Sequence, residues 1–368
     1  MFIRSLKNLR SVDPGFEIRS LVQFDIRVDP IGYDQPRARA FFDTLETRLQ
    51  ELPGVDAVGY ADNAVLAQSD WESGVTVAGH ESKPGEDRVS HINRVSGGYF
   101  ETLRIHLLSG RVFKRSDTVN SPKVVVVNEG FARHYFGDRP AVGHFIGRGA
   151  DPNTPANMEI VGVVNDTRYE DLIQEAPRQV FLCNAQGRPH GHTVYIKAKG
   201  DGQSILASAQ RTVHELEPKA PIMNMKTVER QVEESLATER MIASLSTGFS
   251  LLATALSVLG LYGVMAYMVT QRAREIGIRV ALGAMFGNVI WLVMREVLLL
   301  VVTGIAIAVP LALALGRFVQ SELFGIKATD PITMVFAVLL LSGIAMTAGF
   351  IPARRAASSD PLTALRYE

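Results

Sequence analysis

The pattern of hydrophobic and polar positions divides the chain into a first part of mixed strands and helices and a last part of long apolar runs. Apolar and polar residues alternate over 22–28, which is typical of a half-buried strand. Helical spacing follows over 35–52, where Pro53 and Gly54 stop it, and 55–65 predicts another strand. A strand, a helix and a strand in close succession form an α/β unit.

The middle of the chain is rich in predicted strands. Segments with strand character cover 75–77, 89–95, 123–128, 159–165, 178–182, 193–199 and 222–225, and helical segments cover 129–136 and 202–217. A turn enters a short helix at 97–107, and 109–111 form a second turn. The run KVVVVN at 123–128 is typical of a buried strand. We predict an α+β domain over 16–227, with two lobes and mixed sheets.

The last part of the chain contains three apolar runs. Residues 241–270, 297–316 and 331–353 carry no charged side chain. A helix needs roughly 20 apolar residues to cross the hydrocarbon core of a bilayer. We therefore predict an all-α transmembrane domain over 228–368, with three spans at about 242–270, 292–316 and 331–353. Residues 228–241 predict a polar helix that leads directly into the first span.

The short segment at 271–288, between the first two spans, is basic and amphipathic. Its charged residues are Arg272, Arg274, Glu275 and Arg279, and its apolar residues Ile276, Val280 and Ala284 share one helical face. The tail after the third span is also basic. By the positive-inside rule both segments lie in the cytoplasm and the large domain lies outside. We expect a cytoplasmic partner protein to cover the apolar stripe.

Composition excludes several classes of function. Lys and Arg together equal Asp and Glu, so bulk charge does not favour nucleic acid as a partner. Cys183 is the single cysteine, which excludes an internal disulfide, and its apolar run predicts a small buried thiol on a strand. The predicted spans carry no interior charge, which argues against a proton relay through them.

A search for catalytic motifs finds no candidate for an enzyme. The phosphate loop G-x-x-x-x-G-K-[ST] is absent, so we do not expect this chain to bind ATP itself. The motifs G-x-S-x-G and H-E-x-x-H are absent as well. His190 and His192 predict a solvated Gly/Pro loop rather than a metal site. We therefore predict no catalytic residue, no metal and no cofactor. Gly260 and Gly263 predict close helix packing, either within the chain or against a second copy.

The first residues do not form a cleavable signal peptide, because Arg4, Lys7 and Arg10 interrupt every apolar stretch. A domain outside the membrane needs an upstream segment to carry it across. We therefore predict that 1–15 is the remnant of a lost first transmembrane helix and its linker.

Several motifs around the spans resemble a known family. EIGIRVALGA at 275–284, Asp330-Pro331, IPARRAA at 351–357 and DPLTALR at 360–366 resemble the FtsX-like permease domain of MacB-type ABC transporters. VDPGF at 12–16, YFETL at 99–103, SGRVF at 109–113, VVNE at 126–129 with Ala132-Arg133, and IVGVV at 160–164 are similar to the MacB-type periplasmic core. The resemblance covers nearly the whole chain. It is closest to permeases with duplicated halves and no fused ATPase.

The resemblance implies a multi-pass protein of the bacterial inner membrane with a periplasmic domain. It implies that a separate ABC nucleotide-binding protein, which binds the ATP, docks on a coupling helix at about 272–288. The docking residues carried over are Arg274, Glu275, Ile276, Gly277, Ile278, Arg279, Ala281, Leu282 and Gly283. In such permeases the helices transmit motion to the periplasmic lobes, which is called mechanotransmission.

The function that the resemblance implies is that of a permease subunit for export, efflux or lipoprotein handling. The alternative is a mechanotransmitter without transport, which regulates an extracytoplasmic enzyme such as a cell-wall hydrolase. The expected partners are the ATPase, a second permease half or a homodimer, a periplasmic adaptor or hydrolase, and membrane lipid.

Overall fold

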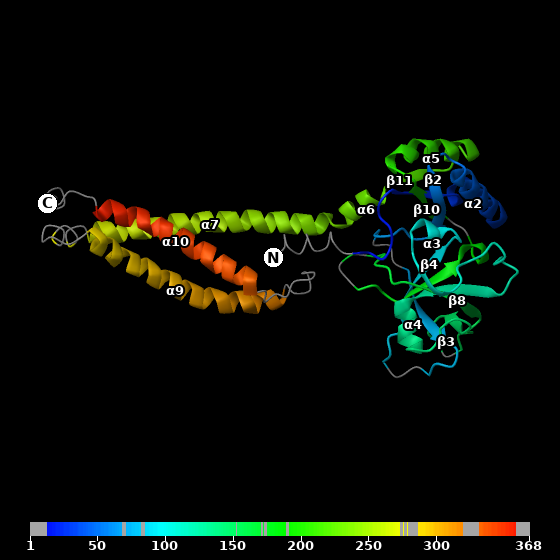
Figure 1. Ribbon diagram of the computed structural model, residues 1–368, viewed down its shortest axis with the longest axis horizontal. Coiled ribbons are helices and arrows are strands. Elements are labelled where there is room, and N and C mark those ends of the chain that lie inside the picture. The colour runs from blue at the N-terminus through cyan, green and yellow to red at the C-terminus, as the bar shows by residue number, and fades with distance from the viewer. Residues whose placement is uncertain are drawn as a thin grey trace. The chain divides into compact units, whose positions relative to one another are not determined.

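The computed structural model describes residues 13–67, 71–81, 85–151, 153–170, 172, 175–188, 191–272, 275, 278, 286–318 and 331–357. The described residues form two compact units, the first ending at Ala237 and the second beginning at Thr238. The predicted fold class is confirmed, because the first unit mixes strands with helices and the second consists of three long apolar helices (Figure 1).

The first unit contains one mixed sheet and several helices. Its strands are β1 (Leu21–Arg27), β2 (Val55–Ala61), β3 (Glu72–Val77), β4 (Val89–Val95), β5 (Leu107–Gly110), β6 (Lys123–Asn128), β7 (Phe145–Arg148), β8 (Met158–Val164), β9 (Gln179–Cys183), β10 (Gly191–Ala198) and β11 (Ile222–Thr227). Its helices are η1 (Asp29–Ile31), α2 (Gln35–Gln50), α3 (Tyr99–Thr102), α4 (Glu129–Phe136), η2 (Asn184–Gln186), α5 (Gln203–Leu216) and α6 (Val228–Ser235).

Strands β3, β4, β6, β7, β8 and β9 close into a ring, which we call the ring lobe. Around it, β4 pairs with β3, β3 with β7, β7 with β8, β8 with β6, β6 with β9, and β9 with β4. The β6–β8 and β4–β9 pairs are parallel and the others are antiparallel. The core holds Val125, Val127, Ile146 and Ile160, with Phe131 of α4. The prediction of a buried strand at 123–128 is confirmed, since only Lys123 is exposed there.

Strand β5 pairs with β8 of the ring. Strands β1, β2, β10 and β11 build a second lobe with helices on one face. They run in the antiparallel order β11–β1–β10–β2, and α2 and α5 cover them. Asp34 caps α2 by accepting a hydrogen bond from the N–H of Arg37 at 3.0 Å. Phe42 and Leu45 of α2 are buried against Ile196 of β10. The pair Ala61–Val95 joins β2 of this lobe to β4 of the ring, so both predicted lobes belong to one sheet.

The helix α3 fills the junction between the two lobes. The ring of Tyr99 lies 5.9 Å from that of Tyr195 on β10, and the ring of Phe100 lies 5.2 Å from that of Phe181 on β9. A Cβ on Gly59 of β2 would lie 2.6 Å from the Cα of Tyr99. The backbones of α3 and β2 therefore approach so closely that only glycine fits at this position.

The structure corrects four predictions about the first unit. Residues 109–111 were expected in a turn, but β5 includes 109 and 110, and β7 forms inside a Gly-rich stretch where no strand was predicted. His192 is not on a solvated loop: it lies on β10, and its side chain is 0% exposed beside Asp62. His190 lies outside the described residues. The predicted helix at 228–241 is interrupted at Leu236, between α6 and α7.

The second unit consists of α7 (Ala237–Gln271), α9 (Phe286–Phe318) and α10 (Pro331–Ala357). The segments Arg240–Met268, Met294–Leu315 and Met334–Ile351 are long and apolar enough to cross a membrane, which agrees with the three predicted spans. Most of their side chains are exposed within the chain, as expected for surfaces that meet lipid or other helices. Pro310 lies inside α9.

Candidate functional site

The helices of the second unit meet at the end that adjoins the predicted docking segment. Met265 of α7 and Met294 and Val297 of α9 are buried together there. Partly buried residues surround them, and these are Leu261, Met268, Ile290, Val301 and Met346. Along α7 and α9 these positions recur at spacings of three and four residues, so each helix contributes one face. This cluster fixes where the two ends of the docking segment leave the helices.

A close approach between α9 and α10 adds to the cluster. A Cβ on Gly349 of α10 would lie 2.6 Å from Cγ2 of Val297, and the neighbouring Ala348 is 6% exposed. Small residues at such crossings let helix backbones come close and gain packing contacts. Gly349 was not predicted as a packing position. Small residues also occur at 342, 343, 345 and 347, so the sequence around Gly349 carries no distinct signal.

A polar pair joins α7 to α9 at the same end. The guanidinium of Arg272 donates a hydrogen bond to the Glu296 carboxylate, with 2.5 Å between Nη1 and Oε1. The backbone N–H of Arg272 bonds to the carbonyl of Met268 at 3.2 Å, which keeps this residue on the last turn of α7. Both side chains are partly exposed, so the pair contributes at most about 1 kcal/mol. Its effect is to orient the end of α7 relative to α9.

These contacts bring the basic segments together at one end of the unit. Gly349, near the end of α10, packs against Val297, near the start of α9, so the last turns of α10 lie beside the first turns of α9. Met265, near the end of α7, packs against Met294 in the same region. Helices α7 and α10 therefore end at the same end of the helical unit (Figure 1). Arg272 follows the last residue of α7, and the exposed Arg354 lies in the last turn of α10.

Two of the nine predicted docking residues can be described. Glu275 and Ile278 are helical and exposed, and Ile278 is 45% exposed although its side chain is apolar. The other seven lie outside the described residues, and these are Arg274, Ile276, Gly277, Arg279, Ala281, Leu282 and Gly283.

The two glycines predicted to pack helices face open space in this chain. A Cβ on Gly260 or Gly263 of α7 would meet no described atom within 4 Å. The close glycine contact of this unit is instead at Gly349. Whether a second polypeptide packs at Gly260 and Gly263 stays a prediction.

The first unit offers hydrogen-bonding and ionic groups but no described metal cluster. Within the described residues no three His, Cys, Asp or Glu side chains gather in a way that could hold a metal ion. Cys183 is buried on β9, as predicted, and burial raises the pKa of its thiol. His80 and His134 both lie near Glu86, with nitrogen–oxygen distances of 2.9 and 3.7 Å.

Comparison with known families assigns both units. The profile of the MacB-like periplasmic core domain matches residues 8–212 of the chain. The chain belongs to the MacB-type permease family. The profile of the FtsX-like permease C-terminal domain matches residues 247–361 of this MacB-type permease, a range that includes most of α7, the predicted docking segment, and the whole of α9 and α10.

Relatives with known names are similar over most of this MacB-type permease. A "Macrolide export ATP-binding/permease protein MacB" of Neisseria gonorrhoeae is 24% identical over 346 residues, which cover 90% of this chain and 51% of the relative. A protein of the same name from Chromobacterium violaceum is 30% identical over 287 residues, which cover 74% of this chain and 43% of the relative. The chain thus spans about half the length of the relatives it matches.

Two solved structures also align with this MacB-type permease. The periplasmic region of MacB from Actinobacillus actinomycetemcomitans aligns with 62% of this chain and 98% of its own length, at 15% identity and a TM-score of 0.39. The extracellular domain of the noncanonic ABC-type transporter YknZ from Gram-positive bacteria aligns with 55% of this chain and all of its own length, at 14% identity and a TM-score of 0.36.

Proposed function

We propose that this chain is a permease subunit that carries the ATP-driven motion of a separate nucleotide-binding protein across the bacterial inner membrane. The motion serves export, efflux or lipoprotein handling. Both family matches and the names of the relatives support this function. The observation that carries it is the end of the helical unit where α7 and α10 both end, α7 just before Arg272 and α10 beyond Arg354, and where the exposed Glu275 and Ile278 follow α7.

The docking segment at 272–288 is the proposed point of entry of this motion. It leaves α7 at a point tied to α9 by the Arg272–Glu296 hydrogen bond and by the packing of Met265 on Met294. A displacement of the segment therefore acts on α7 and α9 together rather than on a loose loop. The apolar side chain of Ile278 supplies contact area to the partner, and Glu275 supplies a charge that orients it.

The basic end of the helical unit also indicates how the chain is oriented in the membrane. A basic end of a helical unit stays in the cytoplasm by the positive-inside rule. The nucleotide-binding protein is cytoplasmic and can reach the docking segment only there. The first unit then lies in the periplasm, where an adaptor or a hydrolase can bind it.

Co-purification with the nucleotide-binding protein tests the docking surface. Glu275→Lys and Ile278→Asp in the full chain should each reduce recovery of the ATPase at least about tenfold, since both lie at the proposed contact. Glu215→Lys is the control, because it reverses a charge at an exposed position of α5 in the first unit. Unchanged recovery for both docking variants would rule out this surface.

A second permease half, or a second copy of this chain, is the proposed partner of α7. The open space at Gly260 and Gly263 supports this, because small residues there leave room for another helix. In a Cys183→Ala background, Gly260→Cys should form a disulfide under mild oxidation with the same cysteine of a second copy, or with a cysteine introduced on the facing helix of a second permease half. Gly343→Cys on α10, also in open space, is the matched control. Cross-linking at Gly343 without any at Gly260 would contradict the proposal.

A further inference from the structure

A pocket of about 310 Å³ opens at one end of the ring lobe. Lys123 and Met158 begin β6 and β8, and Arg148 and Cys183 end β7 and β9. Since β6 and β8 are parallel while β7 and β9 run opposite to them, these residues lie at the same end of the ring. Arg94, next to the last residue of β4, lines the pocket as well. Strand closure thus gathers residues from five strands that are far apart in the sequence.

The charged groups of this pocket all have the same sign. Arg94, Lys123 and Arg148 line it, and no Asp or Glu does. Arg94 contacts the carboxylate of Asp62 at 3.2 Å. No ion pair joins Lys123 or Arg148 to a carboxylate of the described residues. A concave site lined by cations concentrates field lines and favours an anion.

An aromatic side chain holds two of these cations near each other. The guanidinium carbon of Arg148 lies 5.3 Å from the centre of the Trp71 ring, and that of Arg94 lies 5.7 Å from it. Cation–π contacts of this kind fix the guanidinium planes and cost little of their hydrogen-bonding capacity. The guanidinium of Arg148 therefore keeps its N–H groups for a ligand, whereas Nη1 of Arg94 already donates to the Asp62 carboxylate and to the carbonyl of Arg188, which leaves its other N–H groups. A planar guanidinium suits carboxylate and phosphate oxygens.

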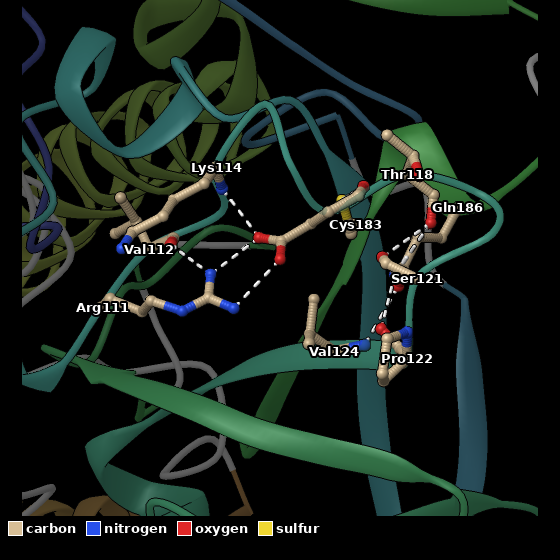
Figure 2. Close-up of polar contacts among 10 residues, drawn as sticks. Arg111, Val112, Lys114, Thr118, Ser121, Pro122, Val124, Cys183 and Gln186 are labelled. Carbon is tan, nitrogen blue, oxygen red and sulfur yellow. Dashed lines mark hydrogen bonds and ion pairs between the residues drawn. The ribbon is translucent and has the colours of Figure 1, made fainter.

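The wall and floor of the pocket are held by hydrogen bonds and are partly apolar. Figure 2 shows the side chain of Gln186 accepting from the N–H of Val124 at 3.0 Å and donating to the carbonyl of Pro122 at 2.8 Å. Met158 and Leu182 contribute apolar surface, and Leu182 is 9% exposed. The pocket therefore combines a cationic rim with a fixed apolar floor.

We propose that this pocket binds a small amphipathic anion, a carboxylate or phosphate monoester with a short apolar tail. The anionic group sits between Arg94, Lys123 and Arg148, and the tail lies on Met158 and Leu182. The volume suits such a ligand, because small-molecule sites begin at about 300 Å³. The site is independent of the docking segment, so it goes beyond the proposed function.

Tryptophan fluorescence tests the proposal directly. The chain has two tryptophans, Trp71 and Trp291, so Trp291→Phe leaves one reporter at the rim of the pocket. The full chain in phosphatidylcholine nanodiscs is titrated with hexyl phosphate, and calorimetry gives the Kd independently. We expect a saturable change in Trp71 emission. Hexanol, with the same tail, and inorganic phosphate, with the same anionic group, should each bind at least tenfold more weakly.

Charge variants separate this site from non-specific binding. Lys123→Glu with Arg148→Glu should weaken hexyl phosphate binding at least tenfold, and the matching pair of Gln substitutions should weaken it in the same direction. Both residues are exposed, so folding should persist, as circular dichroism will show. Arg211→Glu, on the exposed side of α5, is the control and should leave Kd unchanged. Equal binding of hexanol, or an unchanged Kd in both double variants, would overturn the proposal.

Discussion

The carboxyl group of Glu46 provides a quantitative prediction about the stability of the first unit. Burial raises the pKa of Glu46 from its ordinary 4.5 to about 7, and the nearby charge of Asp43 adds to this effect, while Arg115 opposes it. Glu46 lies on α2 against the backbone at Gly98, where a Cβ would be 3.0 Å from its Oε1. The folded chain therefore binds this proton more tightly than the unfolded chain does.

The direction of the pH dependence follows from that difference. Below pH 4.5 Glu46 is protonated in both the folded and the unfolded chain, and above pH 7 it is ionised in both. Between these values the free energy of unfolding falls as the pH rises, because the unfolded chain gives up the proton first. The interval between the two pKa values corresponds to about 3 kcal/mol. Glu46→Gln removes the charge, so at pH 8 it should raise the free energy of unfolding by about 2–3 kcal/mol. At pH 4 it should change little.

Urea unfolding of the full chain, followed by Trp71 emission in the Trp291→Phe background, measures this effect. Glu51→Gln is the matched control, because it removes a carboxylate from an exposed position directly after α2. The parent should lose stability between pH 5 and 7 relative to Glu46→Gln, and Glu51→Gln should follow the parent. Identical pH profiles for the parent and Glu46→Gln would refute the reasoning.

Three further substitutions or reactions test other parts of the molecule. Asp117→Asn should lower the free energy of unfolding by about 2–4 kcal/mol in urea at pH 7, because it breaks a two-fold ion pair of a buried carboxylate with Arg111. Burial alone would raise the pKa of Asp117, but hydrogen bonds from Arg111 and a backbone N–H hold it below its ordinary value. The parent should therefore lose the stability that this ion pair contributes as the pH falls below about 4. N-ethylmaleimide should modify the buried Cys183 roughly 100-fold more slowly in the folded chain than in urea, as mass spectrometry will show. Gly349→Leu should lower the Tm of the chain in nanodiscs through an overpacking cost of about 1–3 kcal/mol, whereas Gly343→Leu, in open space, should not.

Elements with a strong periodic pattern were predictable from the sequence. The helices over 35–50 and 203–216 and the strand at 123–128 appear close to where apolar spacing placed them. The strands β5 and β7 were missed for a physical reason. All four residues of β5 are exposed, so it shows no alternation, and β7 has only four residues, one of which is Gly147. The position of His192 depends on Phe42 and Tyr60, whose rings lie 4.4 and 4.8 Å from it, and no local pattern shows them.

The location of the docking site stays a prediction from the sequence, and the packing beside it could not be predicted. Charge and span lengths identified the segment at 271–288, since polar and apolar stretches contrast there. Within a uniformly apolar helix, a side chain that faces lipid and one that faces another helix look alike, so Met265 and Met294 could not be singled out. The cationic pocket was equally hidden. Arg94, Lys123 and Arg148 come together only when the ring closes.

Closure of the ring also governs the order in which the first unit can assemble. Strand β6, with the sequence KVVVVN, has both of its neighbours, β8 and β9, later in the chain. During synthesis both edges of this β-branched segment are unpaired until β8 has emerged, and its second edge stays unpaired until β9 ends at residue 183. A segment of this kind with an open edge is prone to aggregate. The long sequence separation between β4 and β9 makes their pairing, which closes the ring, slow. Folding of this unit therefore places a demand on chaperones during the interval before β9 arrives.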